Sequence, residues 1–269
     1  MEDKKVMKVA VQIDAENISW KYAKRIFDEA SNLGVVVCKR IYGDWSSPSV
    51  ASWKAPIMEY SIQAIQQFQN TSGKNSSDSA LIIDAMDLLH EGRYQCICLV
   101  SSDSDFTRLA SRLRESEIYV VGMGEQKTPT SFRSACDKFL YLDVLMRDGM
   151  PESGVSKPIV QNTGSGSVDG KSTLRQDDIP AEAGSGLNLQ LIIDAIDDIV
   201  SQDSDDEGWY FMGELGNRLV SRFPDFDVRN FGFYKLTPFI ESLKCYDVKS
   251  EKNPSNPSLK LVYIRKKSD

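Results

Sequence analysis

The sequence predicts an α/β protein, in which helices flank a mostly parallel sheet, joined to a smaller domain of helices and a β-hairpin. The uninterrupted apolar segment Cys96–Val100 is typical of a strand buried on both faces, as in parallel sheets. Strand and helix patterns alternate through the first half of the chain, which favours right-handed crossovers between parallel strands. Residues 151–186, rich in glycine, serine, proline and aspartate, have the composition of a flexible linker. We therefore expect an N-terminal domain over 1–150 and a C-terminal domain over 187–269.

Composition and charge limit the classes of function. The chain has 269 residues, of which 41% are hydrophobic and 26% charged, the balance of a globular protein. We find neither a signal-peptide pattern nor an apolar run long enough to span a membrane, and expect a cytoplasmic protein without membrane contact. Five cysteines without Cys-x-x-Cys spacing disfavour disulfide and zinc sites, and the single histidine, His90, disfavours catalysis built on histidine. The net charge of −7 argues against nucleic-acid binding unless basic patches or bound cations reverse the field locally.

The elements of the N-terminal domain follow from residue spacing. Strands are predicted from apolar and β-branched runs, and helices from apolar residues three or four positions apart. The expected strands are Lys8–Asp14, Val35–Tyr42, Cys96–Ser102, Ile118–Val121 and Phe139–Leu142. The expected helices are Ser19–Ala30, Trp53–Gln66, one within Lys74–Glu91, and Phe106–Glu117.

The C-terminal domain has the outline of a winged helix, which is three helices followed by a hairpin. We expect helices over Leu187–Ser201 and Trp209–Phe223, and a third to Cys245 with Thr237 as its N-cap and Pro238 at its first position. The hairpin strands are expected at Tyr246–Ser250 and Leu259–Ile264. The charge of this domain is divided, with seven acids and no Lys or Arg in 187–207, but eleven Lys or Arg against six acids in 218–269.

Four aspartates are predicted to converge at one edge of the sheet. Asp14, Asp103 and Asp105 follow strands, and parallel strands share their carboxyl edge, where open α/β sheets bind ligands. Asp78 begins a helix that can reach the same edge. Converging carboxylates repel one another unless a cation is bound or some are protonated. An oxygen-only pocket suits Mg²⁺ or Mn²⁺, which would activate water and stabilise the leaving oxygen of a phosphodiester.

Each of these acids also has a purely structural interpretation. Asp103 or Asp105 would cap the helix beginning near Phe106, and Asp14 with Asn17 would form another cap. Asp78 in a first helical turn would interact favourably with the helix dipole. Asp84, six residues further along the same helix, fits a solvated face as well as it fits a site.

Four segments, taken in order, resemble the motifs of the NYN domain, a family similar to PIN-domain ribonucleases. These segments are Val9–Asn17, Lys74–Leu88, Ser101–Thr107 and Val121–Gly124, within a match of about 8–146. The resemblance implies a PIN-like sheet and metal-dependent RNA cleavage. It also implies an acidic centre of Asp14, Asp78, Asp103 and Asp105, which would hold the metal and act in catalysis, with Asn17 assisting and Asp84 as a secondary candidate.

The C-terminal domain resembles the LOTUS domain, also called OST-HTH. The resemblance rests on Trp209, Gly213–Gly216 and especially Phe223–Leu236, and covers about 187–267. It implies RNA binding or, in some relatives, protein binding. Because charge is seldom buried unpaired, we expect RNA contacts from basic residues of this domain, although an ordinary surface position fits each equally well. These residues are Arg229, Lys235, Lys244, Arg265, Lys266 and Lys267.

The sequence thus predicts a divalent-metal-dependent ribonuclease whose tethered C-terminal domain raises the local concentration of RNA. A non-catalytic RNA-binding regulator is the main alternative. A phosphatase of the haloacid-dehalogenase type is a second one, because Asp103–Thr107 fits Asp-x-Asp-x-Thr, although that motif normally follows the first strand. The RNA target, the choice between endo- and exonucleolytic cutting, and whether the chain forms a homodimer are left open.

Overall fold

The computed structural model describes residues 6–68, 76–147, 188–253 and 256–267, so the predicted linker over 151–186 lies outside the described residues. The N-terminal domain contains a six-stranded sheet in which every neighbouring pair is parallel, in the order β3-β2-β1-β4-β5-β6. Its strands are β1 (Lys8–Asp14), β2 (Val35–Gly43), β3 (Gln63–Gln66), β4 (Cys96–Val100), β5 (Tyr119–Gly124) and β6 (Lys138–Tyr141). The predicted α/β class with a mostly parallel sheet is confirmed.

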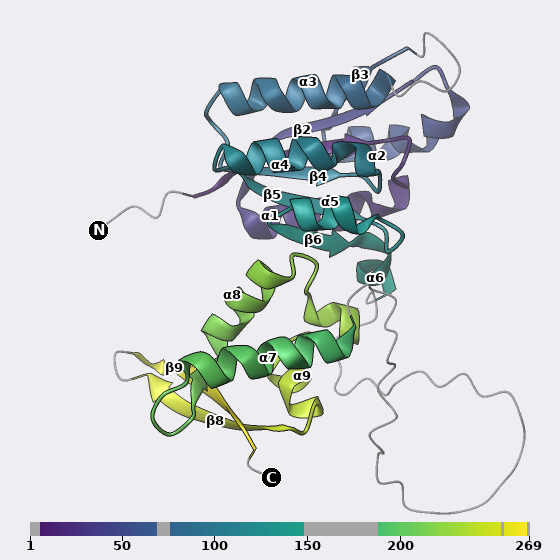
Figure 1. The fold of residues 1–269 in the computed structure, drawn as a ribbon. Helices are drawn as coiled ribbons and strands as arrows, with labels where there is room; N and C mark the ends of the chain where they lie inside the picture. Colours follow the sequence, from purple (N-terminus) through teal and green to yellow (C-terminus); the bar gives the residue numbers. More distant parts are fainter. Residues whose placement is uncertain (1–5, 69–75, 148–187, 254–255, 268–269) are drawn as a thin grey trace, which may run out of the picture.

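Helices cover both faces of this sheet (Figure 1). They are α1 (Ala23–Leu33), α2 (Lys54–Glu59), α3 (Ser76–His90), α4 (Thr107–Glu115), α5 (Thr130–Ala135) and α6 (Leu142–Arg147). Side chains alternate along β1: Val9, Val11 and Ile13 join the core beneath α1 and α6, whereas Ala10 joins the core beneath α3, α4 and α5. Asp14 has the parity of Ala10 and therefore lies on the face where α3 and α4 pack.

The helix predicted over Trp53–Gln66 is wrong in its second half. A 3-10 helix (Pro48–Trp53) and the short α2 occupy its beginning, and Gln63–Gln66 forms β3, which pairs with β2 at the edge of the sheet. An edge strand of four residues is specified by the backbone of its neighbour more than by its own side chains, so its polar sequence gave no strand signal.

The C-terminal domain has the predicted outline of helices and a hairpin. Its elements are α7 (Leu189–Asp203), β7 (Tyr210–Phe211), α8 (Met212–Arg222), α9 (Leu236–Ser242), β8 (Tyr246–Asn253) and β9 (Asn256–Lys266). The strands form an antiparallel sheet in the order β7-β9-β8. The predicted cap of the third helix is wrong, because α9 begins one residue before Thr237, with Lys235 at its N-cap.

The two domains contact each other through a buried polar cluster. Arg133 of α5 and Asp225 after α8 are 7% and 8% exposed and form an ion pair of 2.5 Å. The Tyr141 hydroxyl donates to the same carboxylate at 2.7 Å. The backbone N–H of Phe139 in the edge strand β6 donates to the Pro224 carbonyl at 2.7 Å, so the turn after α8 covers that edge (Figure 1). The described residues include no helix that is both long and apolar enough to cross a membrane.

Candidate metal centre

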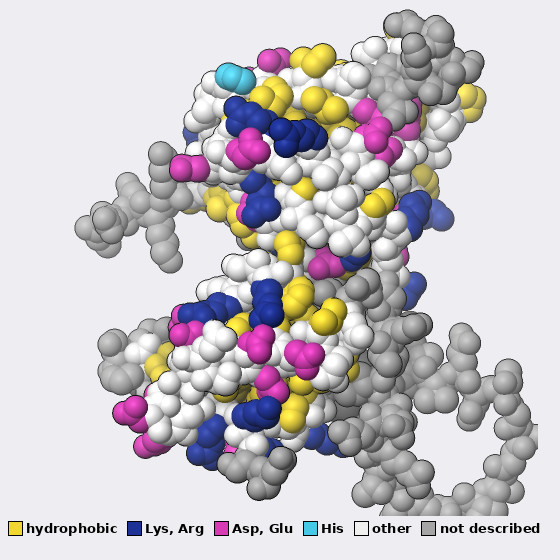
Figure 2. All heavy atoms as spheres, in the orientation of Figure 1, with side chains coloured by type: hydrophobic (Ala, Val, Ile, Leu, Met, Phe, Trp, Pro, Cys, Tyr) yellow, Lys and Arg dark blue, Asp and Glu magenta, His cyan; other side chains and the backbone are white. Residues whose placement is uncertain are grey.

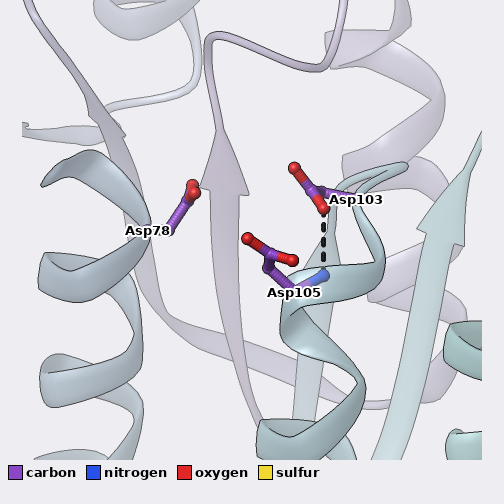
Figure 3. A group of neighbouring side chains, drawn as sticks. All are labelled: Asp78, Asp103 and Asp105. Atoms are coloured by element: carbon purple, nitrogen blue, oxygen red, sulfur yellow. Dashed lines mark hydrogen bonds between the residues drawn. The ribbon is translucent and has the colours of Figure 1, made fainter. Parts of the chain in front are cut away.

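Three aspartates meet at the carboxyl edge of the sheet. Asp103 and Asp105 lie three and five residues after the end of β4, which is buried throughout, and Asp78 lies in the first turn of α3. One carboxylate oxygen from each lies within 4.8 Å of the others. Figure 3 shows Asp78 pointing from its helix toward Asp103 and Asp105, and Figure 2 shows acidic side chains gathered where α3 begins. The edge predicted from strand order therefore brings these three acids together.

Asp14 lies beside this group but deeper, at 1% exposure. Its carboxylate accepts hydrogen bonds from the Asn17 amide at 2.6 Å, the Ser101 hydroxyl at 2.8 Å, and the backbone N–H groups of Glu16 and Asn17. Burial raises the pKa of Asp14, and these hydrogen bonds oppose that shift. Asp14 is not one of the three acids whose oxygens lie within 4.8 Å of one another, although its charge acts on Asp78.

Ser101 is a residue of the site that the sequence argument did not single out. It is 1% exposed, donates to Asp14 and accepts the backbone N–H of Asp103 at 3.1 Å. One hydroxyl thus links the end of β1 to the loop after β4. A signal was present, because a small hydroxyl residue follows the apolar run of β4 directly.

Gly124, at the end of β5, allows the backbone of β5 to pack closely against Ser101. A Cβ on Gly124 would lie 2.6 Å from the Ser101 carbonyl oxygen and 2.7 Å from the Thr128 hydroxyl. Because real Cβ atoms do not approach backbone oxygens so closely, a larger residue would displace Ser101. Close packing against Ser101 therefore explains why position 124 of the Val121–Gly124 segment is a glycine.

Charges of the same sign gather at this centre. Burial and then the charges of Asp14, Asp103, Asp105 and Glu16 raise the pKa of Asp78 from 3.8 to about 7. Glu16, another residue that the sequence argument passed over, also accepts the Ser77 hydroxyl at 3.0 Å. Asp103 additionally caps the 3-10 helix Ser104–Phe106 by accepting the N–H of Asp105 at 2.9 Å, so its structural role and its place in the centre coexist.

Asp84 is not brought to this group. Its carboxylate accepts from Arg40 and from the Tyr42 hydroxyl, with the Gln12 amide at 3.5 Å. Burial, followed by the hydrogen bond to Asp84, raises the pKa of Tyr42. Six residues of α-helix separate Asp84 from Asp78 by about 9 Å along the axis, which accounts for the different surroundings of the two acids.

The basic residues predicted to contact RNA have varied surroundings. Arg229 forms ion pairs with Glu29 of the N-terminal domain at 2.6 Å and with Asp227 at 2.7 Å, so its guanidinium contributes to the contact between the domains. Lys266 pairs with Asp197 at 2.6 Å, and Arg265 with Asp247 at 3.3 Å. The others, Lys235, Lys244 and Lys267, are exposed, and the Lys267 ammonium donates to the Lys244 carbonyl at 2.9 Å.

Two family models match the chain. Residues 8–143 match the NYN domain, and residues 189–257 match the OST-HTH/LOTUS domain, in the predicted order. No curated protein matches the chain. Similar solved structures include a protein of unknown function from Vibrio parahaemolyticus, with 18% identity, 52% of this chain and 96% of that chain covered, and a TM-score of 0.44. They also include an uncharacterized protein from Nitrosomonas europaea, with 24% identity, 41% and 94% coverage, and a TM-score of 0.25.

Proposed function

The chain belongs to the NYN family, part of the PIN-like nuclease superfamily, and from that membership we propose that it is a divalent-metal-dependent ribonuclease. The observation that carries the proposal is the group of three carboxylates at the sheet edge, with oxygens within 4.8 Å of one another. Its donors are oxygens alone, the set that Mg²⁺ and Mn²⁺ prefer. The OST-HTH/LOTUS domain, a type that binds RNA or partner proteins, would recruit the substrate.

Asp78, Asp103 and Asp105 would hold the ion. Asp14, buried beneath them, would add its negative charge to the site. A bound Mg²⁺ or Mn²⁺ supplies an activated water and stabilises the charge that develops on a phosphodiester. The protein's own contribution is orientation: Ser101 and Asn17 hold the Asp14 carboxylate, and the backbone N–H of Asp105 holds that of Asp103. The raised pKa of Asp78 indicates that the site favours an added positive charge, whether a proton or a metal ion.

The proposal is tested by substituting Asp103 with asparagine. We expect Asp103→Asn to abolish cleavage of labelled single-stranded and structured RNAs in Mg²⁺ or Mn²⁺, because it removes a ligand charge while leaving the side-chain volume nearly unchanged. Asp87→Asn is the matched control, since Asp87 is an exposed acid on α3, the helix that carries Asp78. Chelator should abolish wild-type cleavage.

Two outcomes would redirect the assignment. Metal-dependent cleavage that is unchanged in Asp103→Asn would contradict the proposed centre. RNA binding without cleavage in either ion would identify a non-catalytic regulator. The phosphatase alternative has no support in the strand order, because β4 follows three other strands of the sheet in the chain.

A further inference from the structure

The C-terminal sheet has one face in the core and one face rich in aromatic and basic side chains. Tyr210, Tyr246 and Ile264 are buried in the core of the domain. Strand alternation turns their neighbours outward, and Phe211 on this outward face is 38% exposed. We call this face the hairpin platform; its members are Trp209, Phe211, Lys249, Tyr263 and Arg265.

The platform side chains are in mutual contact. The Lys249 ammonium lies 4.4 Å from the ring centroid of Trp209 and 5.4 Å from that of Tyr263. The Arg265 guanidinium lies 4.5 Å from the Trp209 centroid. The rings of Phe211 and Tyr263, paired across β7 and β9, are 5.7 Å apart. Aromatic rings interleaved with cations are thus gathered on one sheet face outside the core.

Charge indicates which kind of partner this face suits. Between Tyr246 and Lys267 the chain has six Lys or Arg residues and two acids, a formal charge of +4 within a chain of net charge −7. The two acids pair with platform cations, Asp247 with Arg265 at 3.3 Å and Glu251 with Lys249 at 3.2 Å. Asp197 of α7 pairs with Lys266 at 2.6 Å, which leaves a surplus of +3 along this segment. A polyanion whose bases expose aromatic faces matches both properties.

We propose that the hairpin platform binds single-stranded RNA, with bases stacked on Trp209 and Tyr263 and phosphates beside Lys249 and Arg265. The proposal rests on the proposed ribonuclease function, because it names the surface by which that substrate is held. It assigns recognition to a face in which only Arg265 was predicted from the sequence. The docking contacts leave this face open, since the N-terminal domain touches the turn after α8 and the hairpin lies at the far end of the C-terminal domain (Figure 1).

The test measures RNA binding by the full chain in chelator, so that cleavage plays no part. The probe is a fluorescein-labelled single-stranded RNA of about 16 nucleotides, followed by anisotropy. We expect Trp209→Ala to weaken binding about tenfold, the value for one lost stacked base. Lys249→Gln should weaken it less and reduce the slope of log affinity against log salt by about 0.7.

Matched controls lie on the same domain. Tyr234 is an aromatic residue with 64% exposure, and Arg222 of α8 is an exposed cation, but neither belongs to the platform. Tyr234→Ala and Arg222→Gln should bind RNA within about twofold of wild type, because they remove no stacking or phosphate contact of the platform. Because Trp209→Ala removes two cation contacts and could disturb the hairpin, Trp209→Phe, which retains a stacking face, should bind close to wild type.

The experiment separates failure of this surface from failure of the nuclease assignment. The proposal is overturned if Trp209→Ala and Lys249→Gln both bind RNA as wild type does. It is also overturned if the Tyr234 and Arg222 variants lose as much affinity as the two platform variants. Wild type that binds no RNA in chelator would also overturn it and would leave a protein as the partner of this face. The cleavage assay with Asp103→Asn answers the nuclease question in each case.

Discussion

Replacing Asp78 with asparagine should make the metal-free protein more stable at neutral pH. The Asp78 carboxyl is 7% exposed, and Asp14, Asp103, Asp105 and Glu16 all act on it with charge of the same sign. Ionising Asp78 therefore costs more free energy in the folded chain than in the unfolded chain, where the carboxylate is surrounded by water. Asparagine keeps the shape and cannot ionise, so it removes the repulsion.

The size and the pH dependence follow from the pKa of Asp78. The rise from 3.8 to about 7 corresponds to about 4 kcal/mol of unfolding free energy, at about 1.4 kcal/mol per unit. Because the folded state holds the proton more tightly than the unfolded state, Asp78 lowers stability progressively as pH rises from about 4 to about 7. Relaxation of the neighbouring acids reduces this, so we expect Asp78→Asn to gain roughly 2 to 4 kcal/mol at pH 8 and almost nothing at pH 4.

Thermal unfolding in chelator, measured for wild type, Asp78→Asn and the control Asp87→Asn across this pH range, provides the assay. A gain of this size raises Tm by roughly 3 °C per kcal/mol for a domain of this length. Adding Mg²⁺ or Mn²⁺ should then stabilise wild type more than Asp78→Asn, since only wild type retains all three ligands. An Asp78→Asn protein that is less stable than wild type at pH 8 in chelator would refute the electrostatic reasoning.

Three further substitutions test the surroundings of the centre. Asp84→Asn should retain metal-dependent cleavage but lose about 1–3 kcal/mol in urea unfolding, because Arg40 and Tyr42 lose a charged acceptor; abolished cleavage with unchanged stability would place Asp84 in the centre after all. Asp225→Asn leaves the Arg133 guanidinium buried without its counter-charge and should destabilise the domain contact by up to about 5 kcal/mol. Hydrogen exchange at the Phe139 amide, which donates to Pro224, should then become faster. Unaltered exchange would count against a docked C-terminal domain. Gly124→Ala should displace Ser101 and weaken Mn²⁺ binding measured by calorimetry, whereas wild-type affinity would show that the strand end yields without cost to the centre.

The sequence predicted those parts of the fold and site that depend on local pattern and chain order. β4 is an unbroken apolar run, so both its burial and the position of Asp103 and Asp105 beyond its end could be inferred. Parallel strands share an edge, which placed these acids near Asp78 without coordinates. β3 escaped prediction because its partner β2 determines it, and its own four residues are mostly polar.

Long-range pairing accounts for the rest. Asp78 and Asp84 lie on one helix and have the same chemistry, but Asp78 faces other acids whereas Asp84 meets Arg40 and Tyr42 of β2. Arg229 was predicted to contact RNA from the surface, yet its guanidinium pairs with Glu29, which lies 200 residues away in the other domain. The domain contact itself depends on Arg133 and Asp225, whose pairing no local spacing encodes.

The net charge of −7 argues against RNA binding for the chain as a whole, but it does not determine RNA binding at one part of the surface. Exposed charges more than about 10 Å apart are largely screened at 0.1 M salt, so RNA at the hairpin would respond to the charge of residues 246–267 and of Asp197, which contacts Lys266, and not to the acids of the metal centre. A phosphate at the sheet edge, in contrast, would face Asp78, Asp103 and Asp105. Recruitment at the hairpin should therefore persist in chelator and weaken with salt, whereas engagement of the centre should require the divalent ion.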